Sequence, residues 1–480
     1  MAIMKKAPEV KKPESRQSVG HNVPAFLRHF SRTERKAMGK ALREKCPRTS
    51  HAEWKPPHNR PDPVGLVLEA DAGRIPDLLA LRHGRMVQSP FTFYRGSALA
   101  MAVDLACTPS TGIRVQCGGD SHIVNFRALA TPERQVIFAL NDLDETLPAP
   151  WEWDLKRLAA STVIACRDNG LSESVARDSV LACVLSYREH MAEFADMKVL
   201  DLWYFALEAE MLIASVKDSA IRRGAIKNLA KARESSTSEG YFPKLVEQSG
   251  GMHVIKDQLP AIFHWKGHSA GEIHPDVRDG YIRYRDSLAP NYRMLLDRYE
   301  LKDAAVKVVG VGSVGTACWM MLLMADEGDP LILQVKEARA SVLEGLAGRS
   351  VYPNHGQRVV NGLRLMQPAS DIFLGWTQGR LGRHFYIRQL RDVKIKFAVE
   401  TFEAARMTLF AGFCGYSLAL SHARSGDAAM ISGYLGKSDA FDKAITAFSV
   451  AYADQNEADH AVLKRAIRDG KVKAVIEAAK

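Results

Sequence analysis

Hydrophobic and polar positions follow two different periods in the first half of the chain. Between residues 113 and 147 the runs IRVQCGGD and VIFALNDLDE alternate as strands and turns do. From Asp154 to about Val216 apolar residues recur at helical spacing, with a longer apolar helix expected over roughly 176–194. Residues 231–270 are rich in Ser, Gly and Lys, which predicts a long irregular stretch.

The second half returns to strand character and then becomes helical again. Residues 305–340 contain the runs AVKVVGVGSVG and LILQVKEA, and the later runs DIFLGW and RHFYIRQL are also strand-like. The segments expected to be helical in this half are Tyr281–Tyr299, Gly356–Gln367, Phe397–His422, Phe441–Tyr452 and Asp459–Ala479. Strands gathered in some regions and long helices in others predict an α+β fold.

Composition is that of a large soluble protein. Hydrophobic residues make up 46% of the 480 positions, which is ample for an extensive core and for two or three domains. No uninterrupted apolar run reaches about 18 residues, so no transmembrane helix is expected. The basic segment Met1–Gly20 lacks the apolar stretch of a signal peptide, and the seven cysteines are scattered, which favours a cytoplasmic protein.

The formal net charge of +10 permits contact with an anionic partner. A nucleotide and a nucleic acid both fit that description. No nucleic-acid-binding motif is present, so a nucleic-acid partner is not expected, and part of the excess charge lies in the N-terminal tail.

One polar cluster has the residue types of a phosphoryl-transfer site. Asp120 and Asn125 lie in GGDSHIVN after one strand, and Asp142 follows a second strand. Phosphoryl transfer needs a carboxylate near the attacking hydroxyl and hard oxygen ligands for Mg²⁺. The loop can orient a nucleophile and reach a metal, and Asp142 can close the metal site from the other side. His122 is expected to brace the loop through backbone hydrogen bonds.

These residues also have plain structural explanations. Asp120 in a Gly-Gly-Asp turn can be a simple turn residue. Asp154, which immediately precedes a helical run, can be an N-cap. The spaced set of five is harder to explain in that way than any one member; it comprises Asp120, His122, Asn125, Asp142 and Asp154.

A second cluster has the features of a phosphate-binding loop and its lysine. A GxGxxG pattern follows a strand, where glycines let backbone N–H groups approach phosphates closely. The loop residues expected to contact a nucleotide are Gly310, Gly312, Ser313 and Gly315. Lys336 lies on the apolar run LILQVKEA, and its ammonium is expected to contact α- and β-phosphates. A lysine that extends from a sheet edge to solvent is the structural alternative.

Two further residues complete the predicted nucleotide site. In kinases a helix glutamate pairs with such a lysine, and Glu344 is the best candidate for it. The run HFYIRQLRD resembles the strand that leads into a kinase hinge. Backbone groups near Gln389–Arg391 are therefore expected to meet an adenine.

The glycine-rich segment also matches the dinucleotide fingerprint of Rossmann folds. In that interpretation TACWMMLLMADE is a helix, LILQVKE is the second strand, and Glu337 is the acid that binds a ribose. The ligand is then NAD(P). No series of βα units continues on either side, and the Asp120–Asp142 cluster has no role, so the kinase-like interpretation is preferred.

The first cluster resembles the small-molecule kinases of the aminoglycoside and choline phosphotransferase group. Their catalytic loop reads HGD-x-H-x-x-N and their metal segment reads IDF-D/E-D/E, which GGDSHIVN and LNDLDE match in type and spacing. The resemblance implies that Asp120 is the catalytic base. It also implies that Asn125 and Asp142 are metal ligands, with Asp144 as a candidate second ligand from the same segment.

The next segment, PAPWEWDLKRLA, resembles the same group of kinases. The match implies that Asp154 holds the backbone of the catalytic loop from below. Gly118 stands where that group has His, so the loop is expected to be anchored differently here.

The two clusters occur in the reverse of the usual kinase order. One site made from both requires a protein-kinase-like two-lobe fold that is circularly permuted and has a large helical C-terminal lobe. Residues 1–60 are then a largely disordered basic tail with the loop that leads into the fold. The other expected parts are a catalytic-loop and metal-binding part with a helical bridge (61–300), a small β-rich nucleotide-binding lobe (301–395) and C-terminal helices packed on the large lobe (396–480).

The span from about residue 60 to 460 resembles a bacterial family known as domain of unknown function 2252. The resemblance is carried by RHGRM, FYRGSA, GGDSHIVNF, NDLDET, WEWDLKRLA, VVGVGSVGT, LQVKEA, SDIFLGW and AYADQ. The expected function is a Mg-ATP-dependent phosphotransferase, or a relative that transfers AMP, acting on an unknown small-molecule or protein acceptor. A non-catalytic nucleotide sensor and a Rossmann-type NAD(P)-binding protein are the alternatives.

Overall fold

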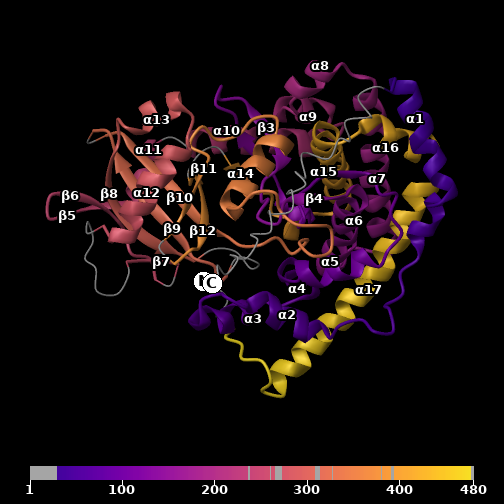
Figure 1. Cartoon of the computed structure of the whole chain (residues 1–480), viewed down its shortest axis with the longest axis horizontal. Coiled ribbons are helices and arrows are strands. Elements are labelled where there is room, and N and C mark those ends of the chain that lie inside the picture. The colour runs from indigo at the N-terminus through magenta and orange to yellow at the C-terminus, as the bar shows by residue number, and fades with distance from the viewer. Residues whose placement is uncertain are drawn as a thin grey trace, which may run out of the picture.

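The computed structural model describes residues 30–235, 238–259, 261–264, 273–308, 314–326, 328–379, 381–390 and 394–476. Within them the chain is an α+β structure with a large helical part, as the change of period along the sequence predicts. Figure 1 shows a sheet region (residues 238–390) on one side and a helical region (the other described residues) on the other. Helix α14 (His355–Met366) lies between them.

A six-stranded antiparallel sheet is the centre of the sheet region. Its strand order is β11–β12–β10–β9–β8–β7. The strands are β7 (Ile262–Phe263), β8 (Glu300–Lys307), β9 (Cys318–Met324), β10 (Pro330–Ala338), β11 (Gly375–Gln378) and β12 (His384–Gln389). β10 is buried along its whole length because both faces of the sheet are covered.

The two faces of β10 have different surroundings because successive side chains of a strand point to opposite sides. Leu331, Leu333 and Val335 pack with residues of α12 (Pro275–Ser287) and α13 (Pro290–Leu296). Lys336 comes next on the opposite face, and Tyr386 of β12 is its direct cross-strand partner. Because of this alternation, the side chain of Lys336 points away from α12 and α13.

The structure contradicts the Rossmann interpretation of this region. Residues 318–324 form strand β9, not the helix which that interpretation requires. β9 pairs antiparallel with both β8 and β10. A dinucleotide fingerprint needs a strand–helix–strand unit with parallel strands, so that interpretation of the segment is wrong.

Residues 219–299 also differ from expectation. The stretch predicted to be irregular contains the end of α10 (Ser219–Ser235), α11 (Ser238–Leu245) and a hairpin of β5 (Val246–Ser249) and β6 (Met252–Ile255). The single helix expected over Tyr281–Tyr299 is two helices, α12 and α13. Pro290 begins the second, and the residue before a proline is biased away from helical geometry.

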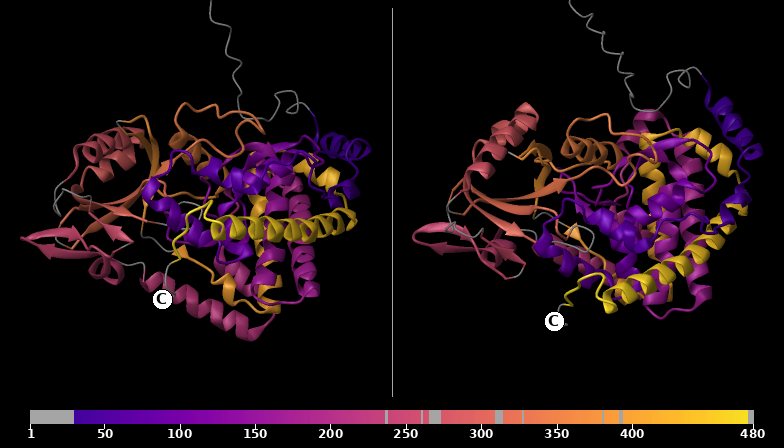
Figure 2. Two further views of the ribbon diagram at one scale, coloured as in Figure 1. Left: turned by 90° about the horizontal axis from the view of Figure 1, so that it is seen from below. Right: turned by 60° about the horizontal axis from the view of Figure 1, so that its bottom comes forward.

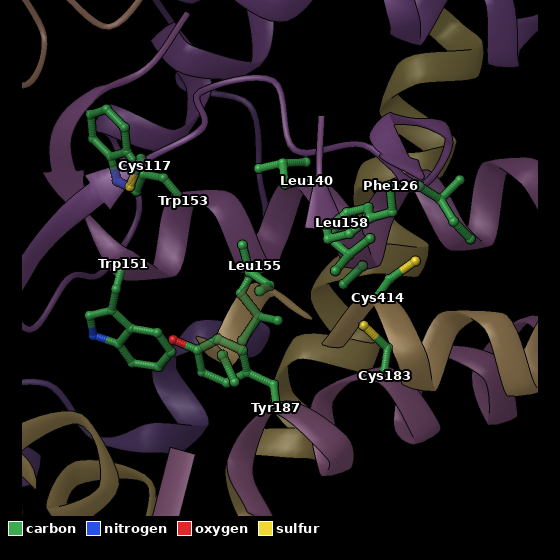
Figure 3. Close-up of a cluster of buried hydrophobic side chains, with 14 of the residues drawn as sticks. Cys117, Phe126, Leu140, Trp151, Trp153, Leu155, Leu158, Cys183, Tyr187 and Cys414 are labelled. Carbon is green, nitrogen blue, oxygen red and sulfur yellow. The ribbon is translucent and has the colours of Figure 1, made fainter. Parts of the chain in front are cut away.

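Helix α6 (Trp151–Asp168) is the centre of the helical region. All its residues from Trp151 to Cys166 are buried, because α7 (Glu173–Asp196), α15 (Ala404–Ser425) and α17 (Ala440–Arg468) surround it. Figure 3 shows part of this core, where Trp151 stacks on Tyr187 of α7 with ring centroids 5.6 Å apart. The long helices expected from Asp154 to about Val216 are confirmed in this part of the chain.

Two small sheets connect this helical core to the loops that carry the predicted catalytic residues. β1 (Arg114–Cys117) pairs with β4 (Leu147–Pro150), and β2 (Phe126–Ala130) pairs with both β3 (Val136–Leu140) and β13 (Lys394–Ile395). The segment 118–125 therefore joins β1 to β2, and residues 141–146 join β3 to β4. Because β1 pairs with β4 and β2 pairs with β3, these two segments lie next to each other.

Part of the segment expected to be a largely disordered tail is ordered. Residues 1–29 lie outside the described residues. Residues 32–41 form α1, whose N-cap Ser31 and Glu34 make a reciprocal capping box. Short 3-10 turns follow at Leu42–Glu44 and Arg48–Ala52, so the prediction of a largely disordered segment is wrong for this part.

The C-terminal helices have different bounds from those expected. α15 begins at Ala404 rather than Phe397, and one 29-residue helix, α17, replaces the two that were predicted. The polar residues that interrupt its apolar pattern have buried partners: Asn456 donates to Pro90 O, and Asp459 binds Arg60. Figure 2 shows α17 running along the outside of the helical region.

The segment after α17 returns to the first helices of the chain. Val475 N–H donates to Ala80 O at 2.8 Å, and His83 Nδ1 contacts Lys473 O at 2.8 Å. The remaining helices are α2 (Pro63–Asp71), α3 (Leu79–Met86), α4 (Pro90–Gly96), α5 (Ala98–Ala106), α8 (Val199–Tyr204), α9 (Ala209–Ser215) and α16 (Ala428–Leu435). None of the helices in the described ranges is long and apolar enough to cross a membrane.

Candidate functional site

A cavity of about 340 Å³ contains residues of both predicted clusters in its lining. Its walls come from α2 to α5, from the segments 118–127 and 142–145, and from residues 337–344 at the end of β10 and just after it. The predicted site residues that line it are Asp120, His122, Asn125, Asp142, Asp144 and Glu344. Lys336 reaches the same place through its contacts with Asp142 and Asp144.

Buried hydrogen bonds from α6 hold the segment 118–125. The carboxylate of Asp154 accepts the N–H groups of Gly118 at 2.6 Å and Gly119 at 3.0 Å. Ser161 Oγ, two turns further along α6, accepts the N–H of Ile123 at 2.9 Å. Asp154 lies inside α6, whose N-cap is Pro150, so the simpler explanation of Asp154 as an N-cap is wrong.

The two glycines of this segment have no room for a side chain. Gly119 has φ +78°, and a Cβ there would lie 2.6 Å from Glu145 O. A Cβ on Gly118 would lie 2.5 Å from Ser121 Oγ and 2.7 Å from a methyl carbon of Leu140. A His at this position, as the catalytic loop of the aminoglycoside and choline phosphotransferase group has, therefore does not fit here.

Asp120 presents one carboxylate oxygen to the cavity. Arg157 Nε donates to its Oδ1 at 2.7 Å, and a second nitrogen of Arg157 donates to the same oxygen. Oδ2 faces His122 Nε2 at 3.8 Å, and 21% of the Asp120 side chain is exposed. Burial raises the pKa of Asp120 to about 6, although Arg157 opposes the shift. Such a carboxyl can take up a proton near neutral pH.

His122 and Asn125 stabilise the same loop. The N–H of His122 donates to Asp120 O at 2.8 Å, and its own carbonyl accepts the N–H of Asn125 at 2.9 Å. Asn125 Nδ2 donates to Asp120 O at 2.7 Å. Burial, reinforced by Arg95 and Arg157, lowers the pKa of His122 well below its usual value, so the imidazole is neutral.

Lys336 joins the sheet region to the segment 142–145. Its ammonium lies 2.9 Å from Asp142 Oδ1 and 2.8 Å from Asp144 Oδ2. Tyr386 donates its hydroxyl proton to Asp144 Oδ1 at 2.6 Å. Lys336 is 4% exposed, so the alternative of a solvent-reaching lysine at a sheet edge is wrong.

The charges of this group determine its protonation. Burial alone would lower the pKa of Lys336, but Asp142 and Asp144 raise it well above its usual value. Burial alone would raise the pKa of Asp142, but Lys336 and then Arg388 lower it well below its usual range. The lysine is therefore charged and Asp142 is ionised at neutral pH.

Oxygen atoms suited to a magnesium ion remain open in this group. Within the described part of the chain, no hydrogen bond engages Asp142 Oδ2 or Asn125 Oδ1, and both are hard oxygen donors. Asp144 has both oxygens engaged, by Lys336 and Tyr386. Asp142 and Asn125 therefore fit a divalent cation better than Asp144 does.

Glu344 does not occupy the position predicted for it. It lies in the turn before α14 rather than in a helix, and its Oε1 lies 3.7 Å from His355 Nδ1. α14 itself contains no glutamate. The interpretation of Glu344 as the helix glutamate that pairs with Lys336 is wrong, because Asp142 and Asp144 take that place.

The rest of the predicted nucleotide site is only partly described. Gly310, Gly312 and Ser313 lie outside the described residues, as does Arg391. Gly315 has φ +86°, and its carbonyl accepts the N–H of Ile75 at 2.8 Å, which ties the end of the glycine-rich segment to the turn after α2. The N–H of Gln389 already donates to Asp371, so that group is not open to an adenine.

Two arginines that sequence reasoning missed fix the geometry. Arg157 lies one turn after Asp154 in a helix whose other residues are mostly apolar. A charged residue in such a helix needs a buried partner, so the sequence does contain a signal for it. Arg358 of α14 donates to the carbonyl oxygens of Thr146 at 2.5 Å and Asp144 at 2.8 Å. It is 1% exposed and connects α14 to the segment that carries the predicted metal ligands.

Comparisons with known proteins identify a family but no activity. The family model described as an uncharacterized protein conserved in bacteria (DUF2252) matches residues 74–466. The matched span includes Asp120, Asp154 and Lys336. No curated protein and no solved structure matches the chain.

Proposed function

The chain belongs to this family of bacterial proteins, and for it we propose a Mg-ATP-dependent phosphotransferase activity with one site built from both sequence clusters. The observation that carries the proposal is the contact of Lys336 with Asp142 at 2.9 Å across 194 sequence positions. A lysine on a buried strand, two aspartates and a loop with Asp and Asn are the parts that position and neutralise a triphosphate in kinases.

In the proposed reaction the acceptor hydroxyl attacks the γ-phosphorus of ATP. The bond from that phosphorus to the β–γ bridging oxygen breaks, and ADP leaves. Asp120 Oδ2, the oxygen that Arg157 leaves open, accepts the hydroxyl proton. Lys336 positions the phosphates. Asn125 and Asp142 would hold Mg²⁺, which supplies charge neutralisation when bound.

The element order supports a circular permutation. β8, the glycine-rich segment, β9, β10 with Lys336, α14, β11 and β12 follow the kinase order, although they come after the catalytic loop in the chain. After β12 the chain continues through β13, which pairs with β2, into α15. The end of α15 contacts the strand before the catalytic loop, because Gln116 N–H donates to Ser425 Oγ at 3.2 Å.

Calorimetric titration with ATP tests the proposal. Binding should require Mg²⁺, and Lys336→Ala and Asp142→Asn should each weaken it at least about tenfold, since each removes a charge-assisted contact of about 1.5–3 kcal/mol. Lys302→Ala is the matched control, because Lys302 is a lysine of the same sheet whose ammonium contacts the exposed Glu300. Binding that is absent, or that ignores both site substitutions, would sink the proposal.

A second candidate function is a nucleotide sensor that does not transfer phosphate. The observation that favours it is the double contact of Arg157 with Asp120, which reduces the basicity of the carboxylate. Incubation with Mg-ATP and separation of products distinguishes the two. A sensor binds ATP and releases no ADP, whereas a phosphotransferase releases ADP faster in the presence of its acceptor.

A further inference from the structure

We propose that Arg95 and Arg127 form a binding site for an anionic group, a phosphate or a carboxylate, that belongs to the acceptor. The site lies on the Asp120 side of the cavity, so the acceptor is an alcohol that already carries a negative charge. This inference names the substrate class of the proposed phosphotransferase and rests on that function.

Five arginines line the cavity, and their partners divide them into two groups. Arg82 binds Asp71, Arg74 donates to Val314 O at 2.7 Å, and Arg339 donates to Ala70 O at 3.1 Å. These three hold the walls together. In the described residues, neither Arg95 nor Arg127 makes a hydrogen bond or an ion pair at contact distance through its guanidinium.

Arg95 comes from α4, and its guanidinium lies 6.0 Å from the ring centre of Phe91. Burial, the largest effect, lowers the pKa of Arg95, while the nearby carboxylate of Asp120 opposes that shift. The side chain is half-buried and lines the cavity beside the loop that carries Asp120. Five guanidinium N–H donors in this position can hold an anion through paired hydrogen bonds.

Arg127 follows the same loop, at the second position of β2. Its Nε is buried and has no hydrogen-bond partner in the described part of the protein. A buried donor without a partner costs about 1–3 kcal/mol, so an anion at this position removes a real penalty. Arg95 and Arg127 are close enough for each to oppose the charge of the other, which a shared anion would relieve.

His122 supplies a third polar group to the same place. The residue is 4% exposed and lines the cavity, and its Nδ1 is buried with no partner among the described residues. Its Nε2 lies 3.8 Å from Asp120 Oδ2, and the ring is in electrostatic contact with Arg95 and Arg127. A neutral imidazole can donate one hydrogen bond from Nδ1 to an anionic oxygen.

The charge balance places this anion on the acceptor rather than on the nucleotide. Lys336 is already balanced by Asp142 and Asp144, so the nucleotide side has its own cation and carboxylates. Arg95 is an additional positive charge in electrostatic contact with Asp120, and Arg127, which is in electrostatic contact with Asp142, is a second one just after the same loop. An amino sugar or a quaternary ammonium acceptor would bring a like charge to two guanidinium groups, which disfavours both.

The test is calorimetric titration of the full chain with inorganic phosphate, first alone and then with saturating Mg-ADP. Phosphate should bind in both states, and Arg95→Gln and Arg127→Gln should each weaken it at least tenfold. Lys396→Ala, which removes an exposed charge at the same cavity, should change it less than twofold. Loss of phosphate binding on addition of Mg-ADP assigns both arginines to the nucleotide and overturns the inference.

If the Arg95 and Arg127 variants fail to fold, the anion site can be tested on the wild-type protein instead. Phenylglyoxal modifies accessible arginines, and mass spectrometry locates them. Phosphate should protect Arg95 and Arg127 and leave the exposed Arg278 unprotected. Intact Mg-ATP binding without phosphate binding or protection overturns the anion site alone, whereas phosphate binding without ATP binding overturns the phosphotransferase alone.

Discussion

The two halves of the candidate site are held in different ways. The segment 118–125 is fixed within the helical region by Asp154, Arg157 and Ser161, all from one buried helix. The Lys336 end of β10 is fixed from outside its own region, by ion pairs to Asp142 and Asp144, whose side chains are 30% and 26% exposed. One half is held inside a core, and the other is held across a boundary.

This difference indicates how the site can respond to a ligand. Buried neutral and charged hydrogen bonds within one core keep the loop geometry constant. Ion pairs at a partly exposed boundary are screened and can exchange partners, so an anionic ligand can compete with the aspartates for Lys336 without unfolding either region. The segment 118–125 is therefore pre-organised, and the position of the sheet region is the adjustable part.

The largest loss of stability is expected when the bonds that fix the segment 118–125 to α6 are removed. Asp154→Asn should lower the free energy of unfolding by about 4 kcal/mol, because it removes a buried charge that accepts two backbone N–H groups. Urea unfolding measures it. Asp168→Asn, at the exposed end of the same helix, is the control and should change little. If Asp154→Asn and Asp168→Asn lower the free energy of unfolding equally, the buried bonds of Asp154 do not hold the segment 118–125 in the way described.

Removal of the Lys336 ion pairs should lower the free energy of unfolding somewhat less than Asp154→Asn does. Lys336→Met should cost about 3 kcal/mol, because Asp142 and Asp144 lose their shared cation in a mostly buried place. Hydrogen exchange should become faster in residues 142–145 and β10 and stay unchanged in α6. Lys302→Met, on the same sheet, should alter neither quantity. Faster exchange throughout α6 would contradict the separation of the two halves.

A backbone substitution sharpens the description of the loop. Gly119→Ala should cost about 2 kcal/mol, since φ +78° disfavours any side chain and the new Cβ would meet Glu145 O at 2.6 Å. Gly170→Ala has a similar φ of +70° in open space and isolates the cost of the backbone conformation alone. A Gly119 variant as stable as the Gly170 variant would mean that the loop has room to move.

The smallest effect concerns a pH-dependent contact inside the sheet region. His264 contacts Asp257 at 2.8 Å and the buried Asp303 at 3.1 Å. Burial opposes the charged imidazole, but Asp303 and Asp257 together raise the pKa of His264 above 6.5. The stabilisation is complete below pH 6.5 and is lost as the pH rises through the folded-state value.

The measurement is the difference in unfolding free energy between the wild type and His264→Gln. It should shrink by less than about 1 kcal/mol between about pH 6 and about pH 9. A difference that grows with pH has the wrong sign and would mean that His264 is neutral in the folded protein.

The loop half could be largely predicted from the sequence because its parts are close together in the chain. The resemblance of GGDSHIVN and PAPWEWDLKRLA to small-molecule kinases implies a loop that Asp154 holds from the following helix, and periodicity locates that helix. Arg157 was missed although it lies one turn beyond Asp154. A charged residue in a helix buried on all sides needs a partner, and that rule identifies it.

The boundary half could not be predicted in the same detail because sheet register and helix starts decide it. Tyr386 reaches Asp144 only because β12 pairs with β10 in one particular register, which no local pattern specifies. Glu344 was assigned to a helix that begins eleven residues later, at His355. The sequence left the role of Arg95 open between an anion contact and a structural ion pair and did not single out Arg127, because the sequence does not show whether a guanidinium has a partner.

The contact between Val475 and Ala80 has a consequence for synthesis on the ribosome. The helices that carry Arg82 and Arg95 form one wall of the cavity, and the segment 472–475 covers them. A nascent chain therefore exposes this wall until nearly all of the described residues have been translated. The core around α6, which holds the segment 118–125, is complete only when α15 and α17 have also emerged, so the cavity is completed late and as a unit.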